Sequence, residues 1–309
     1  MSNLNNSINL VATGSSVNLG TGTKGTKRFF KEAREFWLTP QGYIFNGAQD
    51  FTDEYVAELI ADEKIIVLEK VNSVTPDNVE DSYEDIGRGV TSLQNKGLYG
   101  MILNFREGEY YEEVLNSVSG TSRYDLLAVD NNGTVMGTFA ADGTSLKGFT
   151  LGEHQVLISE GKFDKNSTLQ RYKTQFLETE EFANSAMKYK DDDFDGRNAS
   201  PLNDIKLELT TPSDTDTSIT VKATYRQDGA PFTGIDYSNF LVKTDGTTTN
   251  PTAGDDSATT GTFVLTGITA ISTNDVVSVS LYDNANSRQG ITVGGYAYKS
   301  LTVSKTAVA

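Results

Sequence analysis

The last third of the chain alternates apolar and polar residues over short segments, a pattern typical of half-buried β-strands. The segments are DIKLELTT, TSITVKATYR, SNFLVKTDG, TGTFVLTGI, DVVSVSLYDN and YAYKSLTVSK. Turns rich in Gly, Asp, Asn and Thr separate them at intervals of about ten to fifteen residues. Six or seven strands at this spacing predict a β-sandwich of immunoglobulin size and type over residues 203–309, with no helix after about residue 200.

The first part of the chain mixes strands with two short helices. FTDEYVAELIADE, residues 51–63, predicts a helix because Thr52 is a suitable N-cap and apolar residues recur every four positions. EYYEEVLNSVSG, residues 109–120, predicts a second helix that Gly120 ends. KIIVLEKVNSV and LYGMILNFREG read as strands. In the second of these strands, the residues expected to be buried are Leu98, Met101, Leu103 and Phe105.

Residues 123–163 carry the strongest β-hairpin signals. Asn132-Gly133 separates two apolar runs, and Asp142-Gly143 follows in the same way. HQVLISEGKF predicts a further strand, whereas STLQRYKTQFLETEEF fits a β or a mixed segment. The chain is therefore expected to be mainly β, with a β-sandwich or β-barrel domain with one or two short helices over residues 29–188.

The segment that opens this domain, KRFFKEAREFWLTPQGYIF, interleaves basic and aromatic residues. Its aromatic residues are Phe29, Phe30, Phe36, Trp37, Tyr43 and Phe45. Such interleaving can stack single-stranded nucleic acid, but Glu32, Glu35 and the charge of the whole chain favour packing in a core or a subunit interface. The preceding residues 1–28 are rich in Asn, Ser, Thr and Gly and predict a flexible arm.

An acidic joint, residues 189–202, separates the two predicted domains. Asp191, Asp193, Asp195 and Gly196 match the opening of an EF-hand calcium loop. The twelfth position of that loop, which needs a bidentate Glu, is Leu202. A hydrated acidic hinge between domains is therefore favoured over a calcium site.

The net charge is −16, from 26 basic and 42 acidic residues. Twelve acidic residues and only two lysines lie between Asp50 and Asp85. Stable binding to nucleic acid needs a basic face, so this composition argues against it and suits a surface that repels DNA.

The sequence shows no set of residues in a pattern typical of an enzyme active site. There is no cysteine, and the single histidine, His154, fits a strand position. GTGTKGT at residues 20–26 lacks the spacing of a phosphate-binding loop. We therefore assign no catalytic, cofactor-binding or metal-ligating residue. The absence of a long apolar run and of a leader pattern predicts no membrane span and no secretory signal.

Two segments in the first domain carry a family resemblance. VTPDNVEDSYEDIGRGVTSLQNKGLYGMILNFREGEYYEEVLNSV contains an acidic EDSYED loop, a strand of the MILNF kind and a short helix after GE. YDLLAVDNNGTVMGTFAADGTSLKGFTL follows, with an NGTV turn and a later Gly. In this order the elements resemble the major tail tube proteins of long-tailed bacteriophages, in which an immunoglobulin-like domain often follows the tube domain.

The resemblance implies a virion structural protein made in the cytoplasm of the bacterial host. Its subunits would form hexameric rings that stack into a conduit, with other tail or connector proteins as partners. DNA would pass through without stable binding. The N-terminal arm and the EDSYED loop would contact neighbouring subunits or rings.

The alternatives are a related connector or tail-terminator ring, a head decoration or fibre protein, and a non-viral protein that binds carbohydrate or another surface through its sandwich domain.

Overall fold

The computed structural model divides the chain into two compact units, each with its own hydrophobic core. The first comprises residues 1–52 and 64–199, and the second comprises residues 53–63 and 200–309. Strands predominate in both, which confirms the predicted mainly-β class. The structure describes residues 8–9, 33–45, 51–68, 71–77, 79–86, 91–95, 100–105, 109–120, 124–142, 145–152, 156–159, 170–175, 186–189, 194–257 and 260–309.

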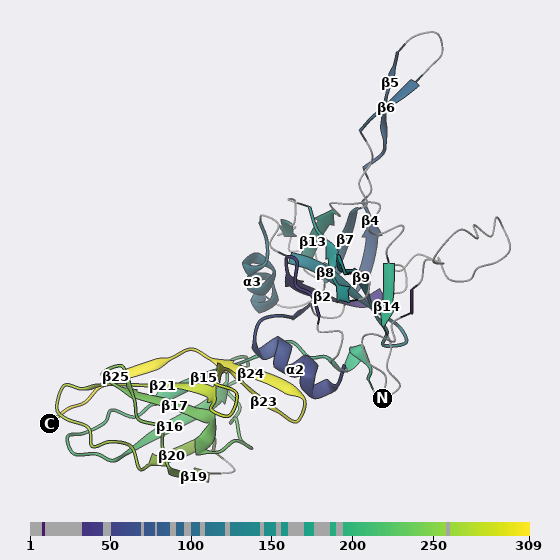
Figure 1. Cartoon of the computed structure of the whole chain (residues 1–309). Helices are drawn as coiled ribbons and strands as arrows, with labels where there is room; N and C mark the ends of the chain where they lie inside the picture. Colours follow the sequence, from purple (N-terminus) through teal and green to yellow (C-terminus); the bar gives the residue numbers. More distant parts are fainter. Residues whose placement is uncertain are drawn as a thin grey trace. The chain divides into compact units, whose positions relative to one another are not determined.

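Two antiparallel sheets enclose the core of the first unit (Figure 1). The larger sheet runs in the order β1 (Ile8–Asn9), β14 (Ala186–Tyr189), β9 (Val135–Phe139), β8 (Tyr124–Asp130), β2 (Ala33–Pro40) and β3 (Ile66–Leu68), with β10 (Leu146–Lys147) beside β9 and β11 (Phe149–Thr150) beside β8. The smaller sheet runs β12 (Val156–Ser159), β13 (Gln170–Gln175), β7 (Gly100–Phe105) and β4 (Ser73–Pro76). The helix α3 (Glu109–Ser117) lies between β7 and β8 in the sequence.

Strand β2 is buried on both faces. Phe36 and Leu38 belong to the core between the sheets, together with Met101, Leu103 and Phe105 of β7. Because successive side chains of a strand point to opposite sides, Trp37 lies on the other face, where it is also fully buried. The expected packing role of this aromatic segment is confirmed for Phe36, Trp37 and Phe45.

The predicted local elements of the first unit are largely present. Asn132-Gly133 turns β8 into β9, with Gly133 in the left-handed region at φ +77°. Residues 139 and 146 pair across the second predicted hairpin. The helix predicted over residues 109–120 is α3, and three of the four core residues expected around β7 are buried. The fourth, Leu98, lies outside the described residues.

The EDSYED segment differs from the predicted loop. Residues 82–85 form the strand β5 (Ser82–Asp85), which pairs antiparallel with β6 (Thr91–Asn95) as a separate two-stranded ribbon. The sequence does not predict the strand β6, because its short segment, TSLQN, has neither a run of apolar residues nor strict alternation of apolar and polar residues. In the N-terminal segment, Ile8 and Asn9 form β1 against Met187 and Lys188 of β14.

Two sheets also enclose the core of the second unit. One contains β19 (Ala253–Ser257), β20 (Thr262–Thr266), β16 (Ser218–Tyr225), β15 (Asn203–Leu209), β24 (Tyr296–Ser300) and β23 (Ile291–Val293) in that order. The other contains β18 (Thr247–Thr248), β17 (Phe240–Thr244), β21 (Val276–Asp283) and β22 (Arg288–Gln289), with β25 (Val303–Thr306) beside β21. All six strand segments predicted after residue 200 are strands, and the described residues of this stretch contain no α-helix.

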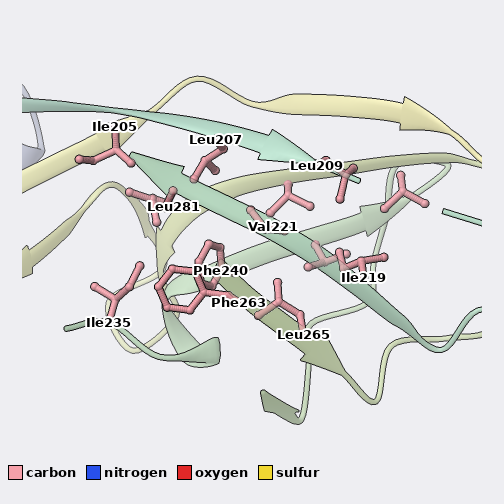
Figure 2. Packing of buried hydrophobic residues seen from close by; sticks show 14 of the residues in the cluster. Ile205, Leu207, Leu209, Ile219, Val221, Ile235, Phe240, Phe263, Leu265 and Leu281 are labelled. Atoms are coloured by element: carbon pink, nitrogen blue, oxygen red, sulfur yellow. The ribbon is translucent and has the colours of Figure 1, made fainter. Parts of the chain in front are cut away.

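The alternating pattern decides which face of each strand is buried in the second unit. In β15, Ile205, Leu207 and Leu209 enter the core, while Lys206 and Glu208 face solvent and pair with each other at 2.6 Å. Figure 2 shows the inward-pointing side chains of β15 and β16 meeting Phe240 and Phe263, whose ring centroids lie 5.2 Å apart.

The helix α2 (Asp53–Ala61) belongs to the second unit, although the sequence analysis assigned it to the first domain. It packs against β23 and β24, more than two hundred residues later in the sequence. A helical pattern identifies the apolar face of a helix but not the sheet that covers it, so the sequence could not reveal this grouping.

We expect Tyr172→Phe to lower the free energy of unfolding by about 1–2 kcal/mol at neutral pH, because the Tyr172 hydroxyl donates to the buried Val118 carbonyl at 3.0 Å. Burial raises the pKa of Tyr172. The unfolded chain therefore loses this proton near pH 10 while the folded chain keeps it, and stability falls as pH rises. Urea unfolding between pH 8 and about 11 should show a shallower alkaline loss in the variant than in the natural protein. Equal slopes would contradict this assignment.

Candidate functional site

The acidic joint is the first candidate site, and its residues 194–196 are packed onto the first unit. Phe194 is only 3% exposed. Its ring stacks on Phe51 at 5.3 Å between centroids and meets Trp37 edge-on at 6.5 Å. Phe45 continues the cluster at 5.6 Å from Phe51. These four residues are called the aromatic cluster, in which Phe45, Phe51 and Phe194 cover the outer face of β2 around its own Trp37.

Asp195 makes local bonds that account for both of its carboxylate oxygens. Its Oδ1 accepts from the backbone N–H of Arg197 at 3.0 Å, which caps the single turn at residues 196–198. The Arg197 guanidinium also bonds both Asp195 oxygens and donates to the Asn131 carbonyl at 2.9 Å. The hydrogen bonds that Arg197 donates to Asp195 raise the pKa of Arg197, and Glu35 and Asp130 add to the effect through their charges.

Two glycines allow the joint to lie close to the β8–β9 turn. A Cβ on Gly133 would lie 1.9 Å from Asp195 Oδ1 and 3.2 Å from the Asp195 Cα. Gly196 is buried against Val129 and Val135, and its N–H donates to the Gly133 carbonyl at 2.9 Å. The turn itself is closed by Asp130, whose Oδ1 accepts from the N–H groups of Asn132 and Thr134. Gly133 therefore serves both the turn and the contact with the joint.

Residues 194–196 thus differ from the solvated hinge predicted over residues 189–202. Residues 194–196 are anchored because a large aromatic residue and a glycine follow the acidic run and bury against β2, β8 and β9. Of the three aspartates of the calcium hypothesis, Asp191 and Asp193 lie outside the described residues, and Asp195 is paired with Arg197. Among the described residues, no group of three or more acidic or histidine side chains is arranged to hold a metal ion. His154 and residues 20–26 also lie outside the described residues.

The second candidate site is the β5–β6 hairpin. Tyr83 is 60% exposed, Ile86 62% and Leu93 50%. Tyr83 and Leu93 are direct cross-strand partners, so their side chains lie on the same face of the ribbon. Tyr83 donates to Asp81 at 3.2 Å, and this hydrogen bond raises the pKa of Tyr83.

The surroundings of these apolar side chains are acidic. Residues 77–86 contain five acidic residues and no Lys or Arg. The hairpin therefore presents exposed apolar groups next to an acidic segment. Such a surface is typical of a protein–protein contact and does not suit a phosphate or nucleic-acid ligand.

The sequence matches no protein-family model, and comparisons with curated proteins and with solved structures found no significant match. Neither of the two α-helices in the described part of the chain has the length and apolar character needed to cross a bilayer.

Gly133→Ala should be more destabilising than Gly42→Ala. The two glycines have nearly the same φ, +77° and +75°, but no described atom lies within 4 Å of a Cβ placed on Gly42. Backbone strain alone should cost about 1–2 kcal/mol in either variant. Displacement of Asp195 should add about 1–3 kcal/mol in Gly133→Ala. Chemical denaturation measures both.

The single tryptophan reports on the same joint. Because Trp37 is fully buried beside Phe194, loosening of residues 194–197 should shift its emission to longer wavelength. We expect this shift in Gly133→Ala and in Phe194→Ala but not in Gly42→Ala. Equal stabilities and equal spectra for the two glycine variants would contradict the anchored joint.

Asp195→Asn should lower the melting temperature by the same amount in calcium and in chelator, because the variant breaks an ion pair with Arg197. Differential scanning calorimetry in the two buffers tests this. A loss of stability that occurs only in calcium would instead favour the calcium loop.

Proposed function

We propose that this protein is a structural subunit of a bacteriophage virion. In this proposal its copies form rings, six to a ring as the family resemblance implies, and the rings stack as a tail tube or a tube-like conduit for DNA. The observation that carries the assembly part of the proposal is the β5–β6 hairpin with its exposed Tyr83, Ile86 and Leu93. The viral identity is supported by the resemblance in the order of elements alone.

An isolated two-stranded ribbon is at best marginally stable in water. The β5–β6 ribbon pairs with no other described strand, and its three large apolar side chains are at least half exposed. Burial in a neighbouring copy would contribute up to about 1.5–3 kcal/mol for each fully buried side chain. Repeated around a ring, this contact would support a regular assembly.

The sheet edges of the first unit offer a second means of assembly. The order of the larger sheet ends at β1 and β3, and that of the smaller sheet ends at β12 and β4. An edge strand presents backbone N–H and C=O groups that another strand can pair with. Pairing between copies would join the sheets of successive subunits into one closed wall.

The negative charge supports a conduit through which DNA passes without stable binding. The acidic stretch between Asp50 and Asp85 is nevertheless split between the two units. Glu58, Asp62 and Glu63 are ion-paired with Arg288 and Lys299 in the second unit. The charge that would repel DNA is therefore that of the other acidic residues of the chain.

Negative-stain imaging of the purified protein at high concentration tests the proposal, with hairpin variants as the discriminating samples. We expect rings or cylinders of constant diameter from the natural protein. Tyr83→Asp and Leu93→Asp should abolish them, because each adds a charge to the apolar contact. Leu301→Asp is the matched control, since Leu301 is 72% exposed but lies in the second unit.

Monomers from the natural protein at every concentration, or assembly that tolerates both hairpin variants, would contradict this contact. Binding to preformed capsids without self-assembly would favour a decoration protein instead. A truncation after Ala199 is a poor test of the first unit, because it also removes β23 and β24, against which α2 packs.

A further inference from the structure

The helix α2 and its surroundings in the second unit contain an ionic arrangement that the assembly does not use. The segment 53–63 carries five acidic residues and no basic one. The opposing basic residues come from the sandwich: Arg288 of β22 and Lys299 of β24. The charges of the two sides are therefore complementary.

Arg288 is the centre of this arrangement. Its side chain is only 12% exposed, and its Nε donates to Asp283 at 3.1 Å. Its two terminal nitrogens reach Glu58 at 3.7 Å and Asp62 at 3.9 Å. Nη2 is buried and has no hydrogen-bond partner among the described residues. Arg288 is thus bonded firmly to the sandwich and attracts α2 mainly through charge.

The groups around Arg288 are otherwise satisfied. Burial would raise the pKa of Asp283, but hydrogen bonds from Asn286 and Arg288 hold that pKa below its usual value. At the other end of the contact, Lys299 pairs with Glu63. These two basic residues are the sandwich residues that form ion pairs with the segment 53–63 in the described part of the chain.

The apolar part of the contact includes two glycines of the sandwich. A Cβ on Gly290 would lie 3.7 Å from the Ala61 Cβ, and one on Gly295 would lie 3.7 Å from the Asp53 Cβ. Both ends of the helix thus lie close to glycines of the sandwich. A nine-residue helix is itself marginal in water. Five residues of the helix are buried: Val56, Ala57, Leu59, Ile60 and Ala61. The helix therefore depends on docking, to which apolar burial and charge both contribute.

We propose that α2 is an ionic latch of the second unit, closed by Arg288 and Lys299. The chain passes between the units at three points: Thr52 to Asp53, Glu63 to Lys64 and Ala199 to Ser200. When the latch opens, residues 53–63 become a loop that leaves the second unit, and only the last of these connections ties the sandwich to the rest of the chain. A closed latch therefore leaves three chain connections between the two units, and an open latch leaves one.

The change in length is large enough to matter. Eleven residues span about 16 Å as a helix and up to about 36 Å when extended. Residues 52 and 64 both belong to the first unit, so the released segment would be a loop of that unit that can extend well beyond the length of the helix. The latch is a property of the single chain, so its test does not depend on whether the proposed assembly is correct.

Hydrogen exchange of the full-length protein, followed by mass spectrometry, tests the latch. Arg288→Gln should speed exchange in residues 53–63 about tenfold, because it leaves Asp283, Glu58 and Asp62 without their cation. In the natural protein, about 1 M salt should speed the same amides, because the Debye length falls to about 3 Å. Arg226→Gln is the matched control, since it removes an exposed pair with Asp204 in the same unit.

A charge reversal guards against simple misfolding. Lys299→Glu and Glu63→Lys should each speed exchange in residues 53–63, and the double variant should restore the natural rate. If Arg288→Gln also speeds exchange in the core strand β16, the variant has disturbed the whole unit. The charge-reversal variants alone then test the latch. Unchanged exchange in residues 53–63 for Arg288→Gln and in high salt, or failure of the double variant to recover, would overturn the proposal.

Discussion

Burial of β2 on both faces is the constraint on which the first unit depends. One face of this strand supplies Phe36 and Leu38 to the core between the two sheets, and the other supplies Trp37 to the aromatic cluster. The second face lies outside the sandwich of sheets, so other segments must cover it. Phe45 and Phe51 come from the chain that follows β2, and Phe194 comes from the joint. The joint is thus part of the first unit because β2 needs a cover.

In the second unit, ion pairs also occur where a segment distant in the sequence packs on the sheet. The sandwich core is built from alternating apolar residues and needs no ion pair. Ion pairs gather where α2, a segment from the first quarter of the chain, lies on β23 and β24. Exposed pairs contribute little to stability on their own, but Arg288 is only 12% exposed. Its pairs and that of Lys299 therefore help to hold the acidic segment and also make the contact specific.

Most local structure could be predicted from the sequence, whereas long-range placement could not. Alternation in segments such as IKLEL, the Asn132-Gly133 turn and the helical spacing of residues 51–63 each reflect a local rule. In contrast, which surface covers a helix face, or a phenylalanine beside an acidic run, is decided by tertiary packing. Phe194 within DDDFDGR was the available signal for the anchored joint, since a large apolar residue in a solvated hinge has no local purpose. Arg288 offered no such signal, because Glu58 and Asp62, its partners in the segment 53–63, lie more than two hundred residues away.

The anchored joint and α2 together change how the two units are related through the chain. A single hydrated linker would let a surface domain be added or removed without effect on the first unit. Instead, the second unit contains a segment inserted between Phe51 of the aromatic cluster and β3, an edge strand of the larger sheet. Phe51 also stacks on Phe194, so the first and last connections between the units begin at neighbouring residues of one cluster. A change that loosens this cluster should therefore disturb both connections at once, which a simple chain of two domains would not do.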